Sequence, residues 1–489
     1  MAQINNALKN KQLHPYLLVV YFIVYGIQQF HPVPHEWLGI LGLFLGLLSV
    51  IFGVKLLIRR FSKNVTNANI GLTFVLLVFL LFLPLSKTLS YLLPQIFEKN
   101  WQSFIFLNVL LLLLLVFVLK RSTPLSNLQH YLNVLFLVLP LTALGQYAFS
   151  LVELSKNKTI IQLPTKKEKL NIYLFVPDGY AASRNLKKYL GYDNTKLTDF
   201  LAKKKFFIPQ NPRSNYSYTV LSVSSFLSLN YIPPSNAVEW SNLRSIDNNL
   251  TMSTLTDLGY ECHLGVFNGK HLGAGSGQDF FPISRYYFML TSFYKLSMLF
   301  FHLDYIDFQR DKAKKTCTDI LATVGQATPT PQYMYLHTMN THAPFVNESF
   351  DVCDTSPCDS MTYKTKTFEI TPDLTALSPQ LDAQLLDSYG NYLKQIENTD
   401  IWLIHNLERV WSKIEKNSIV IVMSDHGFRC LPDSPTAYAE KFQNFCAVYF
   451  PDQNYSVLND SITPVNLMRI VMNKATGTQL PYLRDEFGK

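Results

Sequence analysis

The sequence predicts a membrane-anchored α/β protein, with an N-terminal α-helical transmembrane domain over residues 1–155 and an α/β domain over residues 156–489 that has a mainly parallel central sheet. Long apolar runs fill the first part, whereas short β-branched or aromatic runs alternate with helical patterns in the second. The composition also changes sharply near residue 155, and 489 residues are too many for one ordinary domain.

The first domain contains five apolar runs, most of them near the length of about 20 residues that a helix needs to cross a bilayer. We therefore expect five spans, at Tyr16–Phe30, Trp37–Ile58, Ile70–Leu85, Phe104–Leu119 and Tyr131–Leu151. The first run resembles a signal peptide in length, but the residues after it, 31–35, lack a small-x-small cleavage pattern. We expect it to be a retained anchor.

The basic residues predict the orientation of the spans. Residues 1–155 contain 10 Lys and Arg against 3 Asp and Glu, so this part holds +7 of the formal net charge of +8. Most of these cations precede the first span or follow the second and fourth: Lys9, Lys11, Lys55, Arg59, Arg60, Lys63, Lys120 and Arg121. By the positive-inside rule the N-terminus is cytoplasmic, and an odd number of spans puts the second domain outside the cytoplasm. The charge is thus a topology signal and not a nucleic-acid-binding patch.

The second domain has five strand candidates, at Asn171–Val176, Tyr260–Phe267, Tyr333–His337, Ser418–Met423 and Phe445–Phe450. Helical patterns lie between them, and the longest, Leu381–Lys413, is expected to cross the sheet before the fourth strand. All six cysteines fall in this domain, as expected for a chain that folds in an oxidising compartment. Cys353 and Cys358 flank a turn sequence and are the expected disulfide; six reduced core cysteines are the alternative.

The tetrapeptide Ser424–Gly427 reads Ser-Asp-His-Gly directly after the apolar strand candidate Ser418–Met423. Asp425 and His426 would therefore present an oxygen and a nitrogen ligand at the carboxyl end of a strand, where open α/β sheets place their active sites. A surface turn is the competing interpretation of this pair taken alone.

Three further positions carry polar side chains after strands or before a helix. Asp178 follows the first strand in Val-Pro-Asp-Gly-Tyr, a sequence that is also typical of a plain turn. Residues 215–225 place several hydroxyls, Thr219 among them, ahead of an apolar helix start, where N-caps are the alternative. His342 lies in Asn-Thr-His-Ala-Pro-Phe just past the third strand, and a lone histidine there is often structural.

Together and in this order, over about residues 170–475, these residues resemble the alkaline phosphatase and sulfatase superfamily. The resemblance implies one divalent metal, Zn or Mn, held by Asp178, Thr219, Asp425 and His426, with Thr219 as the nucleophile. It implies that His342 contacts the transferred group or the leaving oxygen. Sulfatases need a Cys or Ser followed by x-Pro-x-Arg to make formylglycine, and this chain has no such sequence. An unmodified Thr219 points to phosphorus rather than sulfur.

With its membrane anchor, the chain looks like lipoteichoic acid synthase and the lipid A phosphoethanolamine transferases. Those enzymes have Glu where this chain has Asp178, and the sequence around Thr219 matches neither group closely. The resemblance implies a transferase in the bacterial inner membrane that moves phosphoethanolamine or phosphoglycerol from a phospholipid to an envelope glycan or lipid-linked acceptor.

His263, Lys270 and His271 follow another strand and are candidates to contact the headgroup phosphate, with surface solvation as the alternative. A hydrolase with the same site, and an inactive envelope scaffold, are the competing functions. The sequence leaves the headgroup, the acceptor, the metal and the oligomeric state open.

Overall fold

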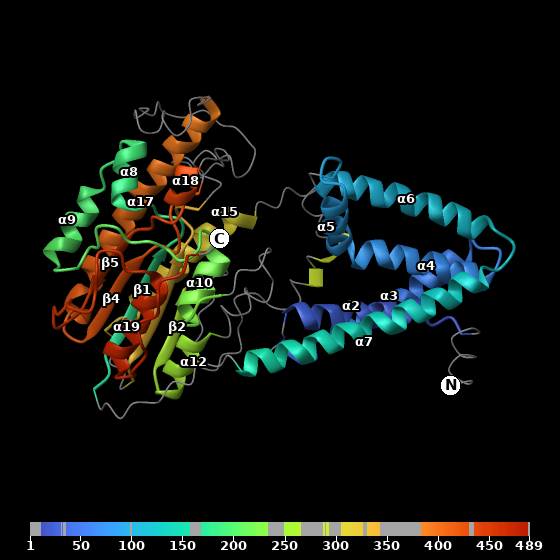
Figure 1. Ribbon diagram of the computed structural model, residues 1–489, viewed down its shortest axis with the longest axis horizontal. Coiled ribbons are helices and arrows are strands. Elements are labelled where there is room, and N and C mark those ends of the chain that lie inside the picture. The colour runs from blue at the N-terminus through green and yellow to red at the C-terminus, as the bar shows by residue number, and fades with distance from the viewer. Residues whose placement is uncertain are drawn as a thin grey trace. The chain divides into compact units, whose positions relative to one another are not determined.

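The structure is a computed structural model, and it describes residues 11–30, 32, 36–97, 100–156, 168–232, 249–265, 287–288, 290–292, 305–325, 330–342, 383–429 and 435–487. The chain forms two compact units (Figure 1). Met1–Thr159 and Phe281–Leu303 make up the membrane unit, and Ile160–Phe280 and Asp304–Lys489 make up the α/β unit. The segment Phe281–Leu303 therefore belongs with the N-terminal helices, although it comes from the second half of the sequence.

The membrane unit consists of apolar helices, of which the described residues contain α2 His14–Phe30, α3 Trp37–Arg59, α4 Val65–Leu80, α5 Phe82–Leu92, α6 Asn100–Lys120 and α7 Ser126–Lys156. Three helices are long and apolar enough to cross a membrane, at Trp37–Arg59, Trp101–Lys120 and Ser126–Val152. The pair α4 and α5 would add a fourth, so the five expected spans are not confirmed.

Two local features explain why the structure has fewer long apolar helices than the five expected spans. Helix α2 has 17 residues, which at 1.5 Å per residue gives about 25 Å, less than the hydrocarbon core of about 30 Å. The expected span Ile70–Leu85 is broken, because α4 ends at Leu80 and α5 leaves it at 77°. Pro84 explains the break, since its ring would clash with the carbonyl of residue 80 in a continuous helix.

Helix α2 is largely enclosed within the membrane unit; it packs against α3, α4 and α7. Tyr287 also lies on it, and its hydroxyl donates to the carbonyl of Ile23 at 2.6 Å while its ring packs 5.3 Å from that of Phe22. Gly26 makes room for this ring, because a Cβ there would come within 2.2 Å of it. The contact fixes part of the segment Phe281–Leu303 among the N-terminal helices.

The α/β unit contains a five-stranded sheet in the order β2-β3-β1-β4-β5. All pairs are parallel except β4 with β5, which confirms the predicted mainly parallel sheet. The five predicted strands are all present, as β1 Asn171–Pro177, β2 Glu261–Gly265, β3 Gln332–Thr338, β4 Ser418–Met423 and β5 Cys446–Tyr449. β1 lies at the centre, so its carboxyl end meets those of β3 and β4.

Helices cover both faces of this sheet (Figure 1). On one face, side chains such as Phe175, Leu336 and Val422 pack with α8 Ser183–Leu190, α9 Thr195–Lys203, α15 Tyr305–Ala322 and α17 Ala383–Ile414. On the other lie α10 Thr219–Leu227, α12 Leu250–Asp257 and α19 Pro464–Thr476, and the short helix α18 Pro435–Glu440 precedes β5. The predicted long helix before the fourth strand is confirmed as α17, whose Leu403, Leu407, Val410 and Ile414 form the buried stripe expected of a covering helix.

The described cysteines give no support to disulfide bonding. Cys262, Cys317 and Cys446 are buried and free, and burial raises the pKa of each thiol. The expected pair Cys353 and Cys358 lies outside the described residues.

Candidate metal centre and nucleophile

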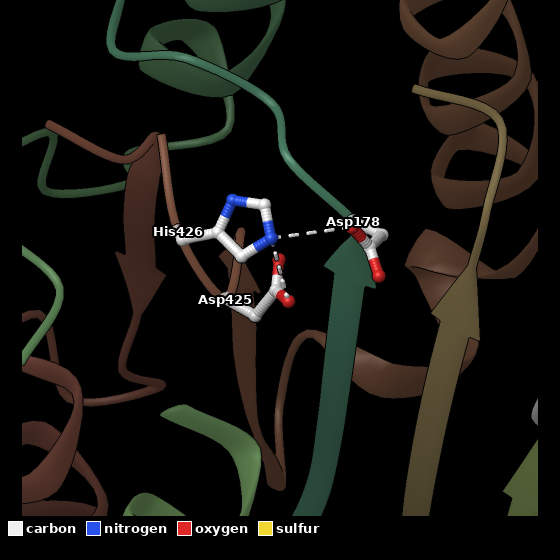
Figure 2. Close-up of side chains that lie close together, drawn as sticks. All are labelled: Asp178, Asp425 and His426. Carbon is white, nitrogen blue, oxygen red and sulfur yellow. Dashed lines mark ion pairs between the residues drawn. The ribbon is translucent and has the colours of Figure 1, made fainter. Parts of the chain in front are cut away.

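Three buried side chains meet at the carboxyl edge of the sheet (Figure 2). Asp178 directly follows the last residue of β1, and Asp425 and His426 follow β4 by two and three residues. Because β1 and β4 are parallel neighbours, both ends open on the same edge. The predicted Asp-His pair is therefore next to Asp178, and each of the three side chains is at most 2% exposed.

The three groups are spaced as ligands of one cation. One ligand atom from each lies within 4.8 Å of the others. His426 Nε2 is 3.5 Å from Asp178 Oδ1 and 3.5 Å from Asp425 Oδ2, and Figure 2 shows this nitrogen facing both carboxylates. Those same two oxygens are buried without a hydrogen-bond partner. An unpaired buried carboxylate oxygen is costly, so the pocket fits a divalent cation that would satisfy all three atoms.

The ring of His426 is held in the tautomer that a metal ligand needs. Its Nδ1 lies 2.7 Å from the carbonyl oxygen of Gly427, which can only accept, so Nδ1 carries the hydrogen. Nε2 is then the nitrogen left for a metal, and it faces the two carboxylates. Gly427 is required here, because a Cβ would come within 2.5 Å of the carbonyl oxygen of Gln443.

Gly179 ties the two strand ends together. It adopts a φ of +69°, and its backbone N–H donates to Asp425 Oδ1 at 3.0 Å. A left-handed backbone favours glycine, and a Cβ would also crowd the His426 ring at 3.3 Å. The Asp-Gly pair at 178–179 thus does form a turn, but the turn aims both acids at one point.

Thr219 is the first residue of α10, and its hydroxyl reaches the same group. Its Oγ1 is 3.2 Å from Asp178 Oδ2 and 3.3 Å from His426 Nε2. The nearby hydroxyl of Ser222 is committed elsewhere, donating to the backbone oxygen of Asp425 at 2.5 Å. Of the hydroxyls between residues 215 and 225, Thr219 is the one with contacts to both Asp178 and His426.

Asp178 is ionised in this environment. Burial alone would raise its pKa, but the charge of His342, the hydrogen bond from His337 and the charge of His426 outweigh burial and hold the pKa well below its usual range. The lowered pKa favours the carboxylate form of Asp178, whose charge a cation would neutralise.

His342 lies in the turn that follows β3, and Arg429 accompanies it. The Arg429 guanidinium Nη2 is 3.3 Å from His342 Nε2, and the guanidinium lies 5.4 Å from the centre of the Tyr218 ring. Tyr218 precedes Thr219 and is 53% exposed. A guanidinium and an imidazole thus lie beside Tyr218, the exposed residue that precedes Thr219.

Of the remaining candidates, His263 does not join this centre. His263 lies within β2, where its Nε2 is 2.7 Å from Gln332 Oε1 and 3.5 Å from Glu261. β3 separates that strand from β1. Lys270 and His271 lie outside the described residues.

Sequence reasoning missed His337 and Arg429. His337 is next to last in β3, fully buried, and its Nε2 lies 3.1 Å from Asp178 Oδ2. A histidine inside the otherwise apolar strand Tyr333–Leu336 was the available signal, because burying an imidazole requires partners. Arg429 offered the weaker signal of a cation three residues beyond the Asp-His pair.

Comparison with solved structures finds distant likenesses. The C-terminal periplasmic domain of EptC from Escherichia coli, in complex with Zn, shares 12% identity with a TM-score of 0.40 over 66% of this chain and 87% of that one. The phosphoethanolamine transferase EptC domain from Campylobacter jejuni shares 15% with a TM-score of 0.38 over 65% and 92%. The lipooligosaccharide phosphoethanolamine transferase EptA from Neisseria meningitidis, an integral membrane protein, shares 13% with a TM-score of 0.40 over 96% and 95%.

Among curated proteins, none matches this sequence significantly. The family model for sulfatases matches residues 182–476, which is more than half of the chain and contains Thr219, His342, Asp425 and His426. The chain therefore belongs to the sulfatase family, within the alkaline phosphatase superfamily whose residue pattern its sequence carries.

Proposed function

We propose that this protein is a metal-dependent membrane phosphotransferase that moves a phospho-headgroup, phosphoethanolamine or phosphoglycerol, from a membrane phospholipid to an envelope glycan. One observation carries the proposal: the hydroxyl of Thr219, at the start of α10, lies between Asp178 Oδ2 and His426 Nε2. A threonine cannot become formylglycine, so a family member with Thr219 in this place needs a substrate that an alkoxide attacks directly, and a phosphodiester is such a substrate.

Asp178, Asp425, His426 and the Thr219 hydroxyl would together hold one divalent cation, and their mixed oxygen and nitrogen atoms suit zinc or manganese. When bound, such a cation lowers the pKa of a neighbouring hydroxyl and screens the charge of an incoming phosphate. The orphaned oxygens of Asp178 and Asp425 support this assignment.

Transfer takes two steps at Thr219. In the first, Oγ1 loses its proton to solvent and attacks phosphorus, a bond from Oγ1 to phosphorus forms, and the bond from phosphorus to the diacylglycerol oxygen breaks. His342 protonates that oxygen as it leaves, while Arg429 at its side binds the phosphoryl oxygens. In the second step an acceptor hydroxyl attacks the phosphothreonine, and Thr219 regains a proton.

The apolar helices of the membrane unit suit a lipid donor. We place the protein in the inner membrane with a cytoplasmic N-terminus and the α/β unit outside the cytoplasm, on the strength of the cationic loops. This requires an odd number of crossings, which follows if α2 and the bent pair α4–α5 each cross together with α3, α6 and α7.

The test is to incubate the purified full-length protein with labelled phosphatidylglycerol or phosphatidylethanolamine in vesicles and to measure diacylglycerol. Release of diacylglycerol with label left on the protein supports a phosphothreonine, and loss of that label only on addition of a glycan acceptor supports transfer. Free headgroup released into water at the same rate without acceptor would show a hydrolase. If neither lipid yields diacylglycerol, the proposal that a phospholipid is the donor is wrong.

A further inference from the structure

A chain of three buried groups leads from the sheet to the candidate metal centre. The Tyr335 hydroxyl lies 2.7 Å from His337 Nδ1, and His337 Nε2 lies 3.1 Å from Asp178 Oδ2. Both Tyr335 and His337 are on β3 and both have no exposed surface. The β-register sets His337 opposite Val176 of β1, two residues before Asp178.

The groups at the two ends, the Asp178 carboxylate and the Tyr335 hydroxyl, determine which nitrogen of His337 carries the hydrogen. Asp178 Oδ2 receives the Thr219 hydroxyl as well as His337 Nε2, and a carboxylate that serves as a metal ligand only accepts, so His337 Nε2 carries the hydrogen. His337 Nδ1 then accepts the hydrogen of the Tyr335 hydroxyl. That hydroxyl keeps its proton, because burial raises the pKa of Tyr335 well above its ordinary value.

This arrangement gives the two oxygens of Asp178 different surroundings. Oδ2 receives His337 Nε2 at 3.1 Å and the Thr219 hydroxyl at 3.2 Å. Oδ1 has no partner and lies 3.5 Å from His426 Nε2. The backbone of Asp178 is held as well, since its N–H donates to the carbonyl of Thr338 at 2.9 Å. The carboxylate therefore cannot rotate without breaking the hydrogen bond from His337.

We propose that His337 is a positioning residue, which turns Asp178 so that Oδ1 faces the cation, and that Tyr335 fixes the tautomer of His337 that this requires. The inference rests on the proposed metal centre. It adds that the affinity of the centre depends on two side chains that never touch the cation. Removing such an outer partner of a metal ligand typically weakens metal binding by about 10- to 100-fold.

The experiment measures the metal affinity of the full-length protein by competition with a chromophoric chelator, using Zn²⁺ and Mn²⁺ separately. We expect His337→Ala to weaken binding by about 10- to 100-fold and His337→Gln, whose amide N–H can reach Asp178, to recover most of the loss. Tyr335→Phe keeps the ring and removes only the hydroxyl, and should weaken binding by a smaller factor of about 3 to 10. His263→Ala is the matched control, because His263 lies on the next strand and bonds to Gln332 instead.

Thermal unfolding of each metal-free variant shows whether it folds, and Tyr335→Phe keeps the test valid if His337→Ala does not. Wild-type affinity in Tyr335→Phe and in a folded His337 variant would overturn the proposal, as would an equal loss in His263→Ala. A wild-type protein that binds no metal overturns this proposal and the metal-dependent function together. A wild-type protein whose metal affinity depends on His337 but which releases no diacylglycerol would leave this inference standing and contradict only the proposal of a lipid donor.

Discussion

Thr219 Oγ1 lies 3.3 Å from His426 Nε2, although the two residues are 207 positions apart in the sequence. Helix α10 and strand β4 both end or begin at the carboxyl edge of the sheet, and this shared edge brings them together. The imidazole donates from Nδ1 to the carbonyl of Gly427, so its Nε2 is the nitrogen that faces Thr219 Oγ1, and Asp178 Oδ2 lies 3.2 Å from the same oxygen. An oxygen in that setting needs a cation to become a nucleophile, which makes its substitution the most direct test.

We expect Thr219→Ala to abolish turnover without loss of the fold, because the methyl side chain keeps the helix start and removes only the reacting oxygen. Thr219→Ser should retain part of the activity. Product formation from labelled lipid measures both. Ser217→Ala is the control, since Ser217 is a buried serine two residues before Thr219. Activity retained in Thr219→Ala and lost in Ser217→Ala would move the nucleophile to Ser217.

Asp425→Ala and His426→Ala should lower metal content and activity together, because each removes one of four proposed ligands. Elemental analysis of purified variants checks this. Asp452→Ala serves as the control, since Asp452 is a surface acid paired with Lys474 at 2.7 Å. Full metal content in both Asp425→Ala and His426→Ala would show that the two residues form a turn and are not metal ligands.

Arg429→Gln should raise KM for the phosphodiester by about fivefold while changing kcat little. A half-exposed charged contact contributes about 1 kcal/mol, and Arg429 is placed beside His342 rather than at the Thr219 oxygen. Initial rates over a range of lipid concentrations separate the two constants. Arg409→Gln, on the exposed side of α17, controls for the lost charge. A fall in kcat with unchanged KM would instead place Arg429 in the chemical step.

Asp400 predicts how stability depends on pH. Burial raises its pKa to about 7, and the hydrogen bonds from Tyr180 at 2.6 Å and Tyr192 at 3.2 Å lower it only in part. Since the unfolded carboxyl has an ordinary pKa of about 4, the native state holds an extra proton between pH 4 and 7. Stability from this group is therefore present at low pH and falls as pH rises toward 7, by about 4 kcal/mol at most.

Asp400→Asn keeps the shape of the side chain and cannot ionise, so it should be more stable than the wild type at pH 8 and close to it in stability at pH 4. Thermal midpoints of the two proteins at both pH values test this. Equal midpoints at pH 8 would show that ionisation of Asp400 in the native state does not lower the free energy of unfolding.

The sequence predicted the sheet and most of the centre for a local reason. An apolar run such as Ser418–Met423 followed by Asp-His places the pair at a strand end wherever the strand packs, so Asp425 and His426 needed no tertiary information. Thr219 needed the family resemblance, because several hydroxyls share its stretch of sequence. His337 could not be assigned a role, since its partner Asp178 lies 159 residues away and only the register of β1 on β3 joins them.

The membrane unit shows the opposite case. Hydropathy suggested one span at Ile70–Leu85, but Pro84 breaks it after Leu80, a local signal that hydropathy alone does not weigh. The place of Tyr287 against α2 was not predictable, because nothing local distinguishes a tyrosine that packs on a distant helix from one in the sheet core. Gly26 becomes informative only once Tyr287 is known to lie over it.

This placement changes what to expect of a chain that begins at residue 160. Tyr287 and Leu290 are buried in the membrane unit, where Tyr287 contacts Ile23 and Phe22. Without α2 the Tyr287 side chain loses these partners, and exposed apolar patches promote association. We expect the shortened chain to keep its metal, because Asp178, Asp425 and His426 all remain, but to require detergent to stay monomeric.

The same shortened chain should cleave a small soluble phosphodiester about as fast as the full-length protein and act poorly on phospholipid in vesicles. The proposed chemistry lies wholly in the α/β unit, whereas the donor phosphate sits at the membrane surface, and a tether raises the effective concentration of the site near it. Rates on both substrates, measured for both proteins at equal metal content, test the prediction. Equal rates on vesicles would mean that the membrane unit serves only to localise the protein, and a soluble phosphodiester would then be the better candidate substrate. Slower cleavage of the soluble substrate alone would mean that the N-terminal helices support the fold of the site itself.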